Sequence, residues 1–183
     1  MIELRALEWP ADRAGVLGLD TSYIADRRLR VEFASQSVVL VEEVLPVRRV
    51  SAYSLADIGD ALPDFAWVRV ANEGGNVVGM AALALERWNR RARLEHLYVT
   101  AGARGRGVGR ALVEAAVGAA EALGARGVWV ETQTTNVGAV RFYEGAGFRW
   151  CGLDSSLYDP EAVPDGAVGL FYWRGIGEGE HTR

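Results

Sequence analysis

The first half of the chain alternates apolar and polar residues with a period of two, the pattern of antiparallel strands that bury one face. Two connections between such runs are short and polar or rich in glycine: residues 35–37 (Ser-Gln-Ser) and residues 72–75 (Asn-Glu-Gly-Gly). Each predicts a β-hairpin, because these residue types favour tight turns between neighbouring strands. The predicted strands are residues 2–7, 28–34, 38–44, 65–70, 77–85 and 91–99. Residues 10–17 predict a short helix, and residues 46–63 predict a loop with a helical turn around residues 55–58.

After residue 99 the apolar period lengthens to that of a helix. Residues 107–123 place valine, alanine and leucine on one face and charged residues on the other, and Gly124 follows as a natural stop. A short buried strand is predicted at residues 128–131, and a helix capped by Asn136 runs to about residue 145. The last two strands are predicted at residues 148–153 and 168–173, joined by a polar loop.

The order of these elements predicts a mixed α+β fold of the α/β class. Its centre is a mixed, mostly antiparallel sheet of about seven strands with helices on its faces. The length of 183 residues fits one domain, which we expect over residues 1–174. The glycine- and charge-rich residues 175–183 predict a flexible C-terminal tail.

Composition narrows the function further. The chain has no membrane-length apolar run and does not start like a signal peptide, so we expect a cytoplasmic protein without membrane contact. The net charge of −4 disfavours non-specific nucleic-acid binding and favours a cationic partner. The chain contains no lysine, which excludes a P-loop lysine and a Schiff base. The single cysteine, Cys151, excludes an intrachain disulfide and is expected to be a small buried hydrophobe. No metal site is predicted.

The most distinctive segment is residues 104–110, Arg-Gly-Arg-Gly-Val-Gly-Arg, which lies between the strand at 91–99 and the long helix. Backbone N–H groups at a helix N-terminus have no intrahelical partners, and the helix dipole makes that end positive. Glycines remove the Cβ atoms that would keep an anion away from these donors. The segment therefore predicts a seat for a pyrophosphate, edged by Arg104, Arg106 and Arg110.

Three alternatives compete with a pyrophosphate seat for this segment. The simplest is a tight connection between strand and helix. A P-loop requires Gly-Lys-Ser/Thr, but Arg110 and Ala111 follow Gly109. A dinucleotide fingerprint requires a third glycine at the position of Arg110, and it opens a parallel βαβ unit rather than an antiparallel meander. The P-loop and the dinucleotide fingerprint are therefore rejected.

What remains is the motif R-x-x-G-x-G at residues 104–109, followed by Asn-Val-Gly-Ala-Val-Arg-Phe-Tyr at residues 136–143. Together they resemble the acetyl-CoA site of the GNAT superfamily of N-acyltransferases. The resemblance implies the GNAT fold, with the sheet splayed at a cofactor cleft and pantetheine lying along the strand that ends at Val99. The residues it assigns to acetyl-CoA are Leu97, Tyr98, Val99, Arg104, Gly105, Arg106, Gly107, Val108, Gly109, Arg110, Asn136, Ala139, Phe142 and Tyr143.

The same resemblance suggests catalytic roles. Tyr143 matches the tyrosine that reprotonates the coenzyme A thiolate, although a tyrosine at this position is also a common buried aromatic. Asn136 matches a pantetheine contact and is equally a helix N-cap. Strand parity predicts that Glu95 shares a face with Leu97 and Val99, where it could act as the base or pair with an arginine. His96 is expected on the opposite face in a structural role.

A narrower similarity concerns the acceptor. Residues 88–91 (Trp-Asn-Arg-Arg) and 151–159 are similar to the streptothricin acetyltransferases within that superfamily. This similarity makes carboxylates and aromatic rings candidates for binding an amine-bearing cation. The arginines on the strand at 91–99 argue against a polycationic acceptor unless carboxylates outnumber them locally. The acceptor candidates are Trp88, Asn89, Asp154 and Tyr158.

We therefore expect an N-acetyltransferase that moves acetyl from acetyl-CoA to a primary amine of a small cationic molecule, such as a streptothricin-like antibiotic or a polyamine, by direct attack in a ternary complex. One alternative is a protein N-terminal or lysine acetyltransferase. Another is a non-catalytic acyl-CoA-binding sensor module. The resemblance is also compatible with a homodimer formed through the C-terminal strands, where residues 171–173 form an edge or fill the core.

Overall fold

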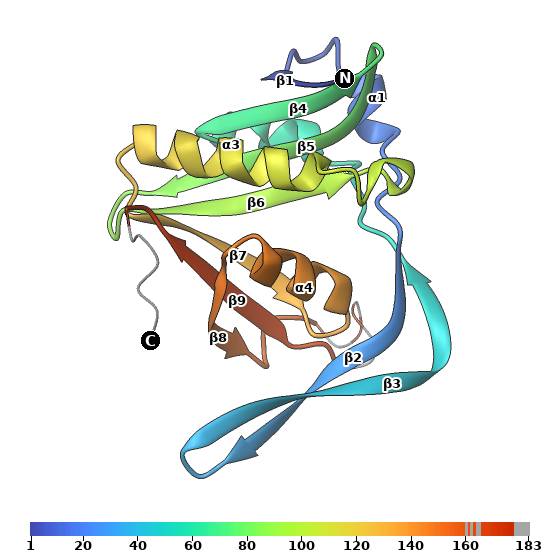
Figure 1. Cartoon of the computed structure of the whole chain (residues 1–183), viewed down its shortest axis with the longest axis vertical. Helices are drawn as coiled ribbons and strands as arrows, with labels where there is room; N and C mark the ends of the chain where they lie inside the picture. Colours follow the sequence, from blue (N-terminus) through green and yellow to red (C-terminus); the bar gives the residue numbers. More distant parts are fainter. Residues whose placement is uncertain (160, 162, 164–165, 178–183) are drawn as a thin grey trace. The chain divides into compact units, whose positions relative to one another are not determined.

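The computed structural model describes residues 1–159, 161, 163 and 166–177 (Figure 1). In that part of the chain the strands are β1 (Ile2–Ala6), β2 (Tyr23–Ala34), β3 (Ser37–Ser51), β4 (Trp67–Glu73), β5 (Asn76–Glu86), β6 (Arg91–Val99), β7 (Gly127–Gln133), β8 (Arg149–Asp154) and β9 (Gly169–Gly175). The helices are α1 (Arg13–Leu17), α2 (Ile58–Ala61), α3 (Val108–Ala122) and α4 (Val137–Gly145), with short 3-10 helices η1 (Leu62–Asp64) and η2 (Ala101–Ala103). None of these helices combines the length and the hydrophobicity needed to cross a membrane.

Strands of the described residues form a seven-stranded sheet in the order β1-β4-β5-β6-β7-β9-β8, while β2 and β3 form a separate two-stranded sheet. The pairs β1–β4, β4–β5, β5–β6 and β8–β9 are antiparallel. The pair β6–β7 is parallel, joining Ala92 to Val128 and Arg93 to Trp129. A parallel pair needs a long crossover connection, and α3 lies in it. The predicted mixed, mostly antiparallel sheet is confirmed.

The chain divides into two compact units. The first comprises Met1–Ser22, Ala52–Val130 and the segment from Arg174, and the second comprises Tyr23–Ser51 and Glu131–Trp173. The expectation of a single domain over residues 1–174 stays a prediction. Of the predicted tail, Gly175 ends β9 and the Ile176 N–H donates to the Arg126 carbonyl at 3.0 Å. Its residues 178–183 lie outside the described residues.

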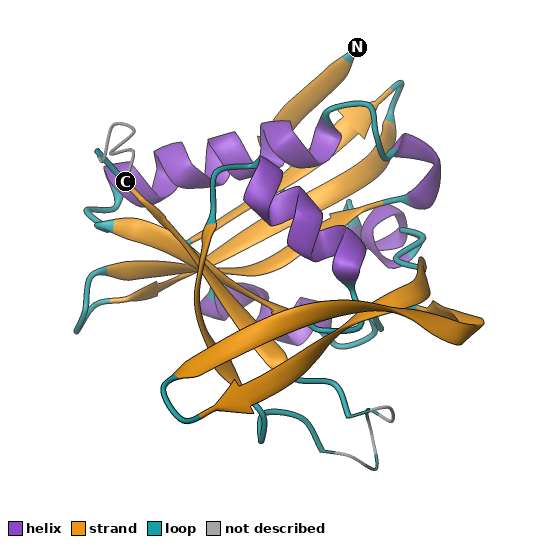
Figure 2. Cartoon of the chain, turned by 60° about the horizontal axis from the view of Figure 1, so that its bottom comes forward, coloured by secondary structure: helices purple, strands orange, loops and turns teal. Residues whose placement is uncertain are grey.

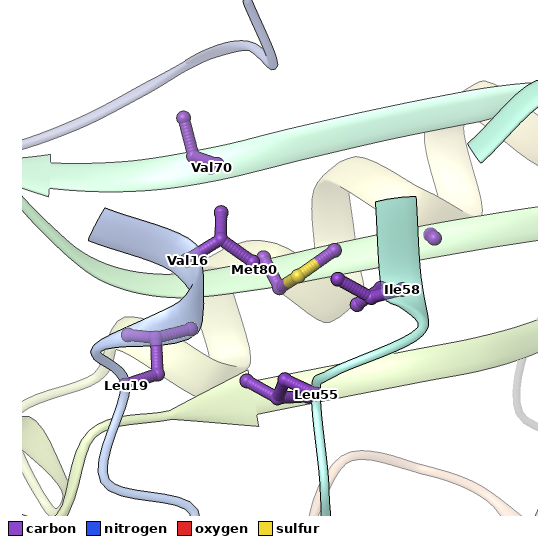
Figure 3. Packing of buried hydrophobic residues seen from close by; sticks show 7 residues of the cluster. Val16, Leu19, Leu55, Ile58, Val70 and Met80 are labelled. Carbon is purple, nitrogen blue, oxygen red and sulfur yellow. The ribbon is translucent and has the colours of Figure 1, made fainter. Parts of the chain in front are cut away.

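The core of the first unit has a layer of side chains on each face of its sheet. On one face, Met80 packs with residues of α1, α2 and the segments beside them (Figure 3). Gly79, its neighbour on β5, points to the opposite face, where an added Cβ would lie 3.2 Å from Leu112 and 3.4 Å from Val108 of α3. The sheet of this unit thus lies between α3 on one face and the short helices α1 and α2 on the other. The first layer contains Val16, Leu19, Leu55, Ile58, Val70, Met80 and Ala82.

Gly79 allows β5 and β6 to approach closely beneath α3. A Cβ at this position would lie 2.8 Å from the Tyr98 carbonyl oxygen, which is backbone and cannot rotate away. We expect Gly79→Ala to lower the free energy of unfolding by about 1–3 kcal/mol, measured by urea denaturation. The matched control is Gly118→Ala in α3, where an added Cβ meets nothing within 4 Å. That change should stabilise the helix by about 0.5–1 kcal/mol. Equal stability of Gly79→Ala and the unmodified protein would contradict the packing argument.

Both predicted hairpins are present. Gly74 and Gly75 have φ of 59° and 87°, so the β4–β5 turn uses the left-handed backbone that glycine adopts without strain.

The β2–β3 hairpin is a long twisted ribbon (Figure 2). Its strands extend beyond the prediction, and the expected loop at residues 46–63 is wrong in its first part because β3 continues to Ser51. The register shifts between Ala25 and Arg27, which creates an irregularity that accommodates Pro46 without a ladder donor. The predicted turn at residues 55–58 is present, since the Ile58 N–H donates to the Leu55 carbonyl at 3.2 Å, and α2 follows from Ile58.

Two expectations about the C-terminal strands are corrected. Cys151 is exposed rather than buried, because it lies at a register shift of β8, the edge strand of the sheet. Its thiol donates to the Phe171 carbonyl at 3.3 Å. Residues 171–173 do not form a sheet edge, since β9 lies between β7 and β8 and Tyr172 is completely buried. A dimer through an edge made by these residues is therefore excluded.

Candidate active site

The predicted anion seat lies where α3 begins. Gly105 and Gly107 have φ of 74° and 86°, a backbone conformation that strains other residues, and Gly107 is the residue that precedes the first turn. A Cβ on either glycine would meet nothing within 4 Å, so the space above both is open. The amides of Val108 and Gly109 belong to the first helical turn and have no intrahelical acceptor. With the dipole of a 15-residue helix behind it, this terminus can bind pyrophosphate oxygens.

The arginines around the seat are engaged differently from the prediction. The Arg104 guanidinium donates to the carbonyls of Val99 at 2.9 Å, Asp20 at 3.1 Å and Ser22. Its side chain therefore ties residues 20–22 to the end of β6 instead of lining the seat. Arg106 makes a two-point contact with Glu73, whose pKa it lowers by hydrogen bonding. That pair is exposed, so an incoming anion could displace it at low cost.

A β-bulge in β6 decides which side chains share a face. Ala82 pairs with His96 but Leu83 pairs with Leu94, so Glu95 is an extra residue with no partner across the ladder. The bulge reverses the alternation of side chains at this point. The prediction that Glu95 lies on the face of Leu97 and Val99 is therefore wrong.

The bulge groups the functional candidates in a new way. Arg93, His96 and Tyr98 lie opposite Ala84, Ala82 and Met80, three residues on one face of β5. The Glu95 carboxylate forms an ion pair with Arg93 and so belongs to the same group. Leu97 and Val99 lie opposite Ala81 and Gly79, on the face covered by α3. His96 was expected on the opposite face of the sheet from Glu95, but the two side chains lie on the same face.

Half-buried aromatic rings form a cluster around His96 and Tyr98 on this face. The His96 and Tyr98 rings stack with centroids 5.6 Å apart, and His96 Nδ1 lies 3.3 Å from the Tyr98 hydroxyl. Phe65 meets His96 edge-on at 5.1 Å, and Tyr53 lies 5.9 Å from Tyr98. Burial lowers the pKa of His96 and raises the pKa of Tyr98, so at neutral pH the imidazole is mainly uncharged and the phenol protonated. Tyr53 and Phe65 could not be identified from the sequence, because they come from segments without a motif.

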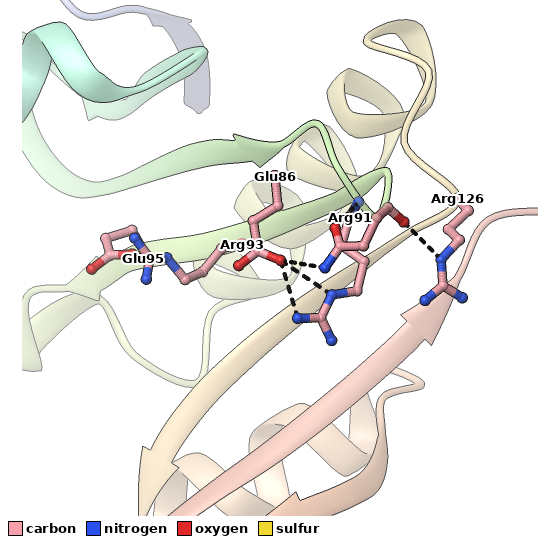
Figure 4. A network of polar contacts seen from close by, with 6 residues as sticks. Glu86, Arg91, Arg93, Glu95 and Arg126 are labelled. Carbon is pink, nitrogen blue, oxygen red and sulfur yellow. Dashed lines mark hydrogen bonds and ion pairs between the residues drawn. The ribbon is translucent and has the colours of Figure 1, made fainter. Parts of the chain in front are cut away.

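The arginines of β6 are balanced by carboxylates (Figure 4). Arg91 donates to Glu86 Oε2 at 3.0 and 3.2 Å, and Arg93 pairs with Glu95. Burial acts to raise the pKa of Glu86, but the hydrogen bonds from Asn89 and Arg91 outweigh it and the net shift is downward. These pairings cancel the charges of Arg91 and Arg93 one for one, but the two carboxylates do not outnumber the two arginines, so the objection to a polycationic acceptor is reduced and not removed.

The two acceptor candidates in the β5–β6 turn differ in their surroundings. Asn89 donates to Glu86 at 2.9 Å and accepts from the Arg91 N–H at 3.0 Å, so it holds the turn together. Trp88 is 87% exposed. Neither position contradicts acceptor binding, but only Trp88 presents a large uncovered surface.

In the second unit, the motif at residues 136–143 forms the N-cap and most of α4. Asn136 is buried, and its Oδ1 accepts from the Ala139 N–H at 3.0 Å, which confirms the helix cap. Tyr143 is 7% exposed and packs edge-on against Phe142 at 5.3 Å and Phe148 at 5.7 Å. Both residues are held in fixed positions.

The remaining acceptor candidates also lie in the second unit. The Tyr158 hydroxyl donates to the carboxylate of Glu131 on β7. Asp154 accepts from the N–H and the hydroxyl of Ser156 at 2.7 Å each, and these hydrogen bonds lower the pKa of Asp154. Glu131 was not assigned to the acceptor from the sequence, because its contact with Tyr158 joins positions 27 residues apart. Among the described residues, His, Cys, Asp and Glu nowhere form a group of three that could hold a metal ion.

Comparison with known proteins gives a consistent result. Residues 39–148 match the acetyltransferase (GNAT) family. The chain is 31% identical over 161 residues to the streptothricin acetyltransferase of Streptomyces lavendulae, covering 84% of this chain and 85% of that protein. It also matches the crystal structure of nourseothricin acetyltransferase with a TM-score of 0.83 and 31% identity, covering 95% of this chain and 98% of that one. A protein from Bacillus anthracis assigned as a streptothricin acetyltransferase, solved with acetyl coenzyme A, shares the fold with a TM-score of 0.81 at 24% identity over 96% of this chain and 98% of that chain.

Proposed function

The chain belongs to the GNAT acetyltransferase family, and from this premise we propose that it transfers acetyl from acetyl-CoA to a primary amine of a streptothricin-like cationic acceptor. The observation that carries the proposal is the glycine loop at the N-terminus of α3, where Gly105 and Gly107 have positive φ and the space above them is open. A streptothricin acetyltransferase that matches most of the chain supports this activity. The pairing of two β6 arginines with carboxylates cancels positive charge that would otherwise repel a cationic acceptor. An enzyme of this activity would protect its host from the antibiotic.

The residues present fit the chemistry of acetyl-CoA. The amides from Gly105 to Arg110 suit the pyrophosphate, and the main chain of β6 from Leu97 to Val99 suits pantetheine, with one of its N–H groups polarising the thioester carbonyl. In the second unit, Asn136, Ala139 and Phe142 are the further cofactor contacts that we propose. Arg104 contributes through its main chain, since its guanidinium is occupied.

The proposed reaction is a direct attack. The acceptor nitrogen bonds to the thioester carbonyl carbon, and the carbon–sulfur bond breaks. Glu95 takes the proton that the amine loses, directly or through a water molecule, and Tyr143 gives a proton to the departing thiolate. The products are the acetylated amine and coenzyme A.

Glu95→Gln tests the proposed base. The amide keeps the size of the side chain but cannot take a proton, so we expect kcat to fall about a hundredfold while the Kd for acetyl-CoA stays unchanged. Discontinuous assays of thiol release with streptothricin measure kcat, and calorimetry measures the Kd for acetyl-CoA. An unaltered kcat would reassign Glu95 to a purely ionic role beside Arg93.

The function as a whole is tested by thiol release from acetyl-CoA with a panel of amines: streptothricin, spermidine, an aminoglycoside and a peptide with a free N-terminus. We expect streptothricin to give the highest kcat/KM. Acetylation of the peptide alone would identify a protein acetyltransferase. Binding of acetyl-CoA without turnover of any amine would identify a sensor module.

A further inference from the structure

Two ion pairs involve arginines of β6: the first reaches across to Glu86 of β5, and the second contains the proposed base. Glu86 pairs with Arg91, and Arg93 pairs with Glu95 (Figure 4). The guanidinium carbons of Arg91 and Arg93 lie 5.2 and 5.7 Å from the centroid of the same tryptophan ring, Trp129. The proposed base therefore already holds a cation, supplied by its own strand.

The contact between Arg93 and Glu95 is easy to exchange. The side chains are 42% and 31% exposed, and ion pairs between partly exposed side chains contribute little to stability, although the Arg93 Nε atom at the contact is itself buried. Arg93 has a second support in the face of Trp129, which attracts a guanidinium independently of any carboxylate. Arg93 can thus release Glu95 without losing both of its favourable contacts.

The surroundings of Glu95 suit a cation. Glu95 shares this face of the sheet with the stacked, half-buried rings of His96 and Tyr98. A carboxylate beside aromatic rings is the arrangement that recognises ammonium groups. An alkyl ammonium of the acceptor offers the same charge as a guanidinium in a smaller volume.

We propose that the Arg93 guanidinium occupies, on Glu95, the place of the acceptor's ammonium group, and that Arg93 is an internal competitor that sets the affinity for cationic amines. This rests on the proposed function, in which Glu95 meets the acceptor. An acceptor must displace Arg93 before its amine can reach the base. Weakly cationic amines compete poorly for that position, so Arg93 determines specificity as well as affinity.

The test measures the Kd for streptothricin by calorimetry on the full chain saturated with coenzyme A, which permits binding without turnover. Arg93→Met keeps the length of the side chain and removes the competing charge, so Kd should fall about three- to fivefold. KM for streptothricin at saturating acetyl-CoA should fall by the same factor. A Kd that is unchanged or higher would overturn the proposal, because it would mean that Arg93 orients Glu95 or plays no part.

Arg91→Met is the matched control. Arg91 lies over the same ring and on the same face as Arg93 but pairs with Glu86, so its removal should leave the Kd for streptothricin unchanged. A second comparison combines Arg93→Met with Glu95→Gln. Without the carboxylate there is nothing to compete for, so the arginine change should then have no effect on Kd. An equal gain in affinity from Arg93→Met in the unmodified protein and in the Glu95→Gln variant would contradict the competition model.

Failure of this inference differs from failure of the proposed function. If the function is wrong, the unmodified enzyme releases no thiol with streptothricin. If only the inference is wrong, the unmodified enzyme turns streptothricin over and Arg93→Met binds it no more tightly. Thermal melting followed by circular dichroism checks that each variant is folded, and Arg93→Gln replaces Arg93→Met should the latter not fold.

Discussion

Gly107→Val should abolish tight binding of coenzyme A while the protein stays folded. Gly107 has φ of 86°, which a β-branched residue adopts only with strain, and the new side chain would fill the open space over the α3 amides. Losing two charge-assisted hydrogen bonds to a phosphate corresponds to about 3 kcal/mol, or a Kd raised on the order of a hundredfold. Calorimetry with coenzyme A measures this change.

The control for that variant is Gly102→Val in η2, a few residues earlier. A Cβ there also meets nothing within 4 Å, but Gly102 is not among the glycines with positive φ, so valine can be accommodated without strain. We expect its Kd for coenzyme A to stay within about twofold of the unmodified protein. If both variants bind coenzyme A normally, the helix terminus is not the anion seat, and the cofactor assignment loses its main support.

Tyr143→Phe should lower kcat about a hundredfold and leave acetyl-CoA affinity nearly intact. The phenylalanine retains the ring that packs between Phe142 and Phe148, so the fold is kept, but it cannot supply a proton to the thiolate. Single-turnover and steady-state thiol release measure the rate, and calorimetry measures the affinity.

Tyr172→Phe separates catalysis from packing. Tyr172 is also buried, and its hydroxyl lies 3.4 Å from Glu144, an arrangement in which burial and the nearby carboxylate raise its pKa. Deleting this hydroxyl should leave kcat unchanged and lower the free energy of unfolding by about 1 kcal/mol. Equal losses of kcat in the two variants would show that removal of a buried hydroxyl, rather than of a proton donor, is responsible.

Much of the fold could be predicted from local pattern because local physics decides it. The period of two marked the strands of the antiparallel meander, and the period of 3.6 marked α3 within one residue at each end. The Gly74–Gly75 turn and the Asn136 cap depend on the backbone freedom and hydrogen bonds of a few neighbouring residues. The length of β3 was missed because Pro46 is typical of a strand end, whereas a register shift accommodates it.

The candidate site was predictable in its residues and less so in its geometry. The glycine loop was predictable because a backbone with positive φ favours glycine, so the conformation can be inferred from the residue types. The hydrogen-bond partner of each arginine could not be inferred in this way. Arg104 contacts residues more than 80 positions away, and Arg106 contacts Glu73, 33 positions away.

The sequence by itself determined the family, the glycine loop and the order of the elements, since each depends on residues close together in the chain. Tertiary structure alone decided which residues face one another around Glu95. One additional residue in β6, set by its register against β5, moves Arg93, Glu95, His96 and Tyr98 onto a common face. Register is a property of two strands together, so no pattern within either strand could reveal it.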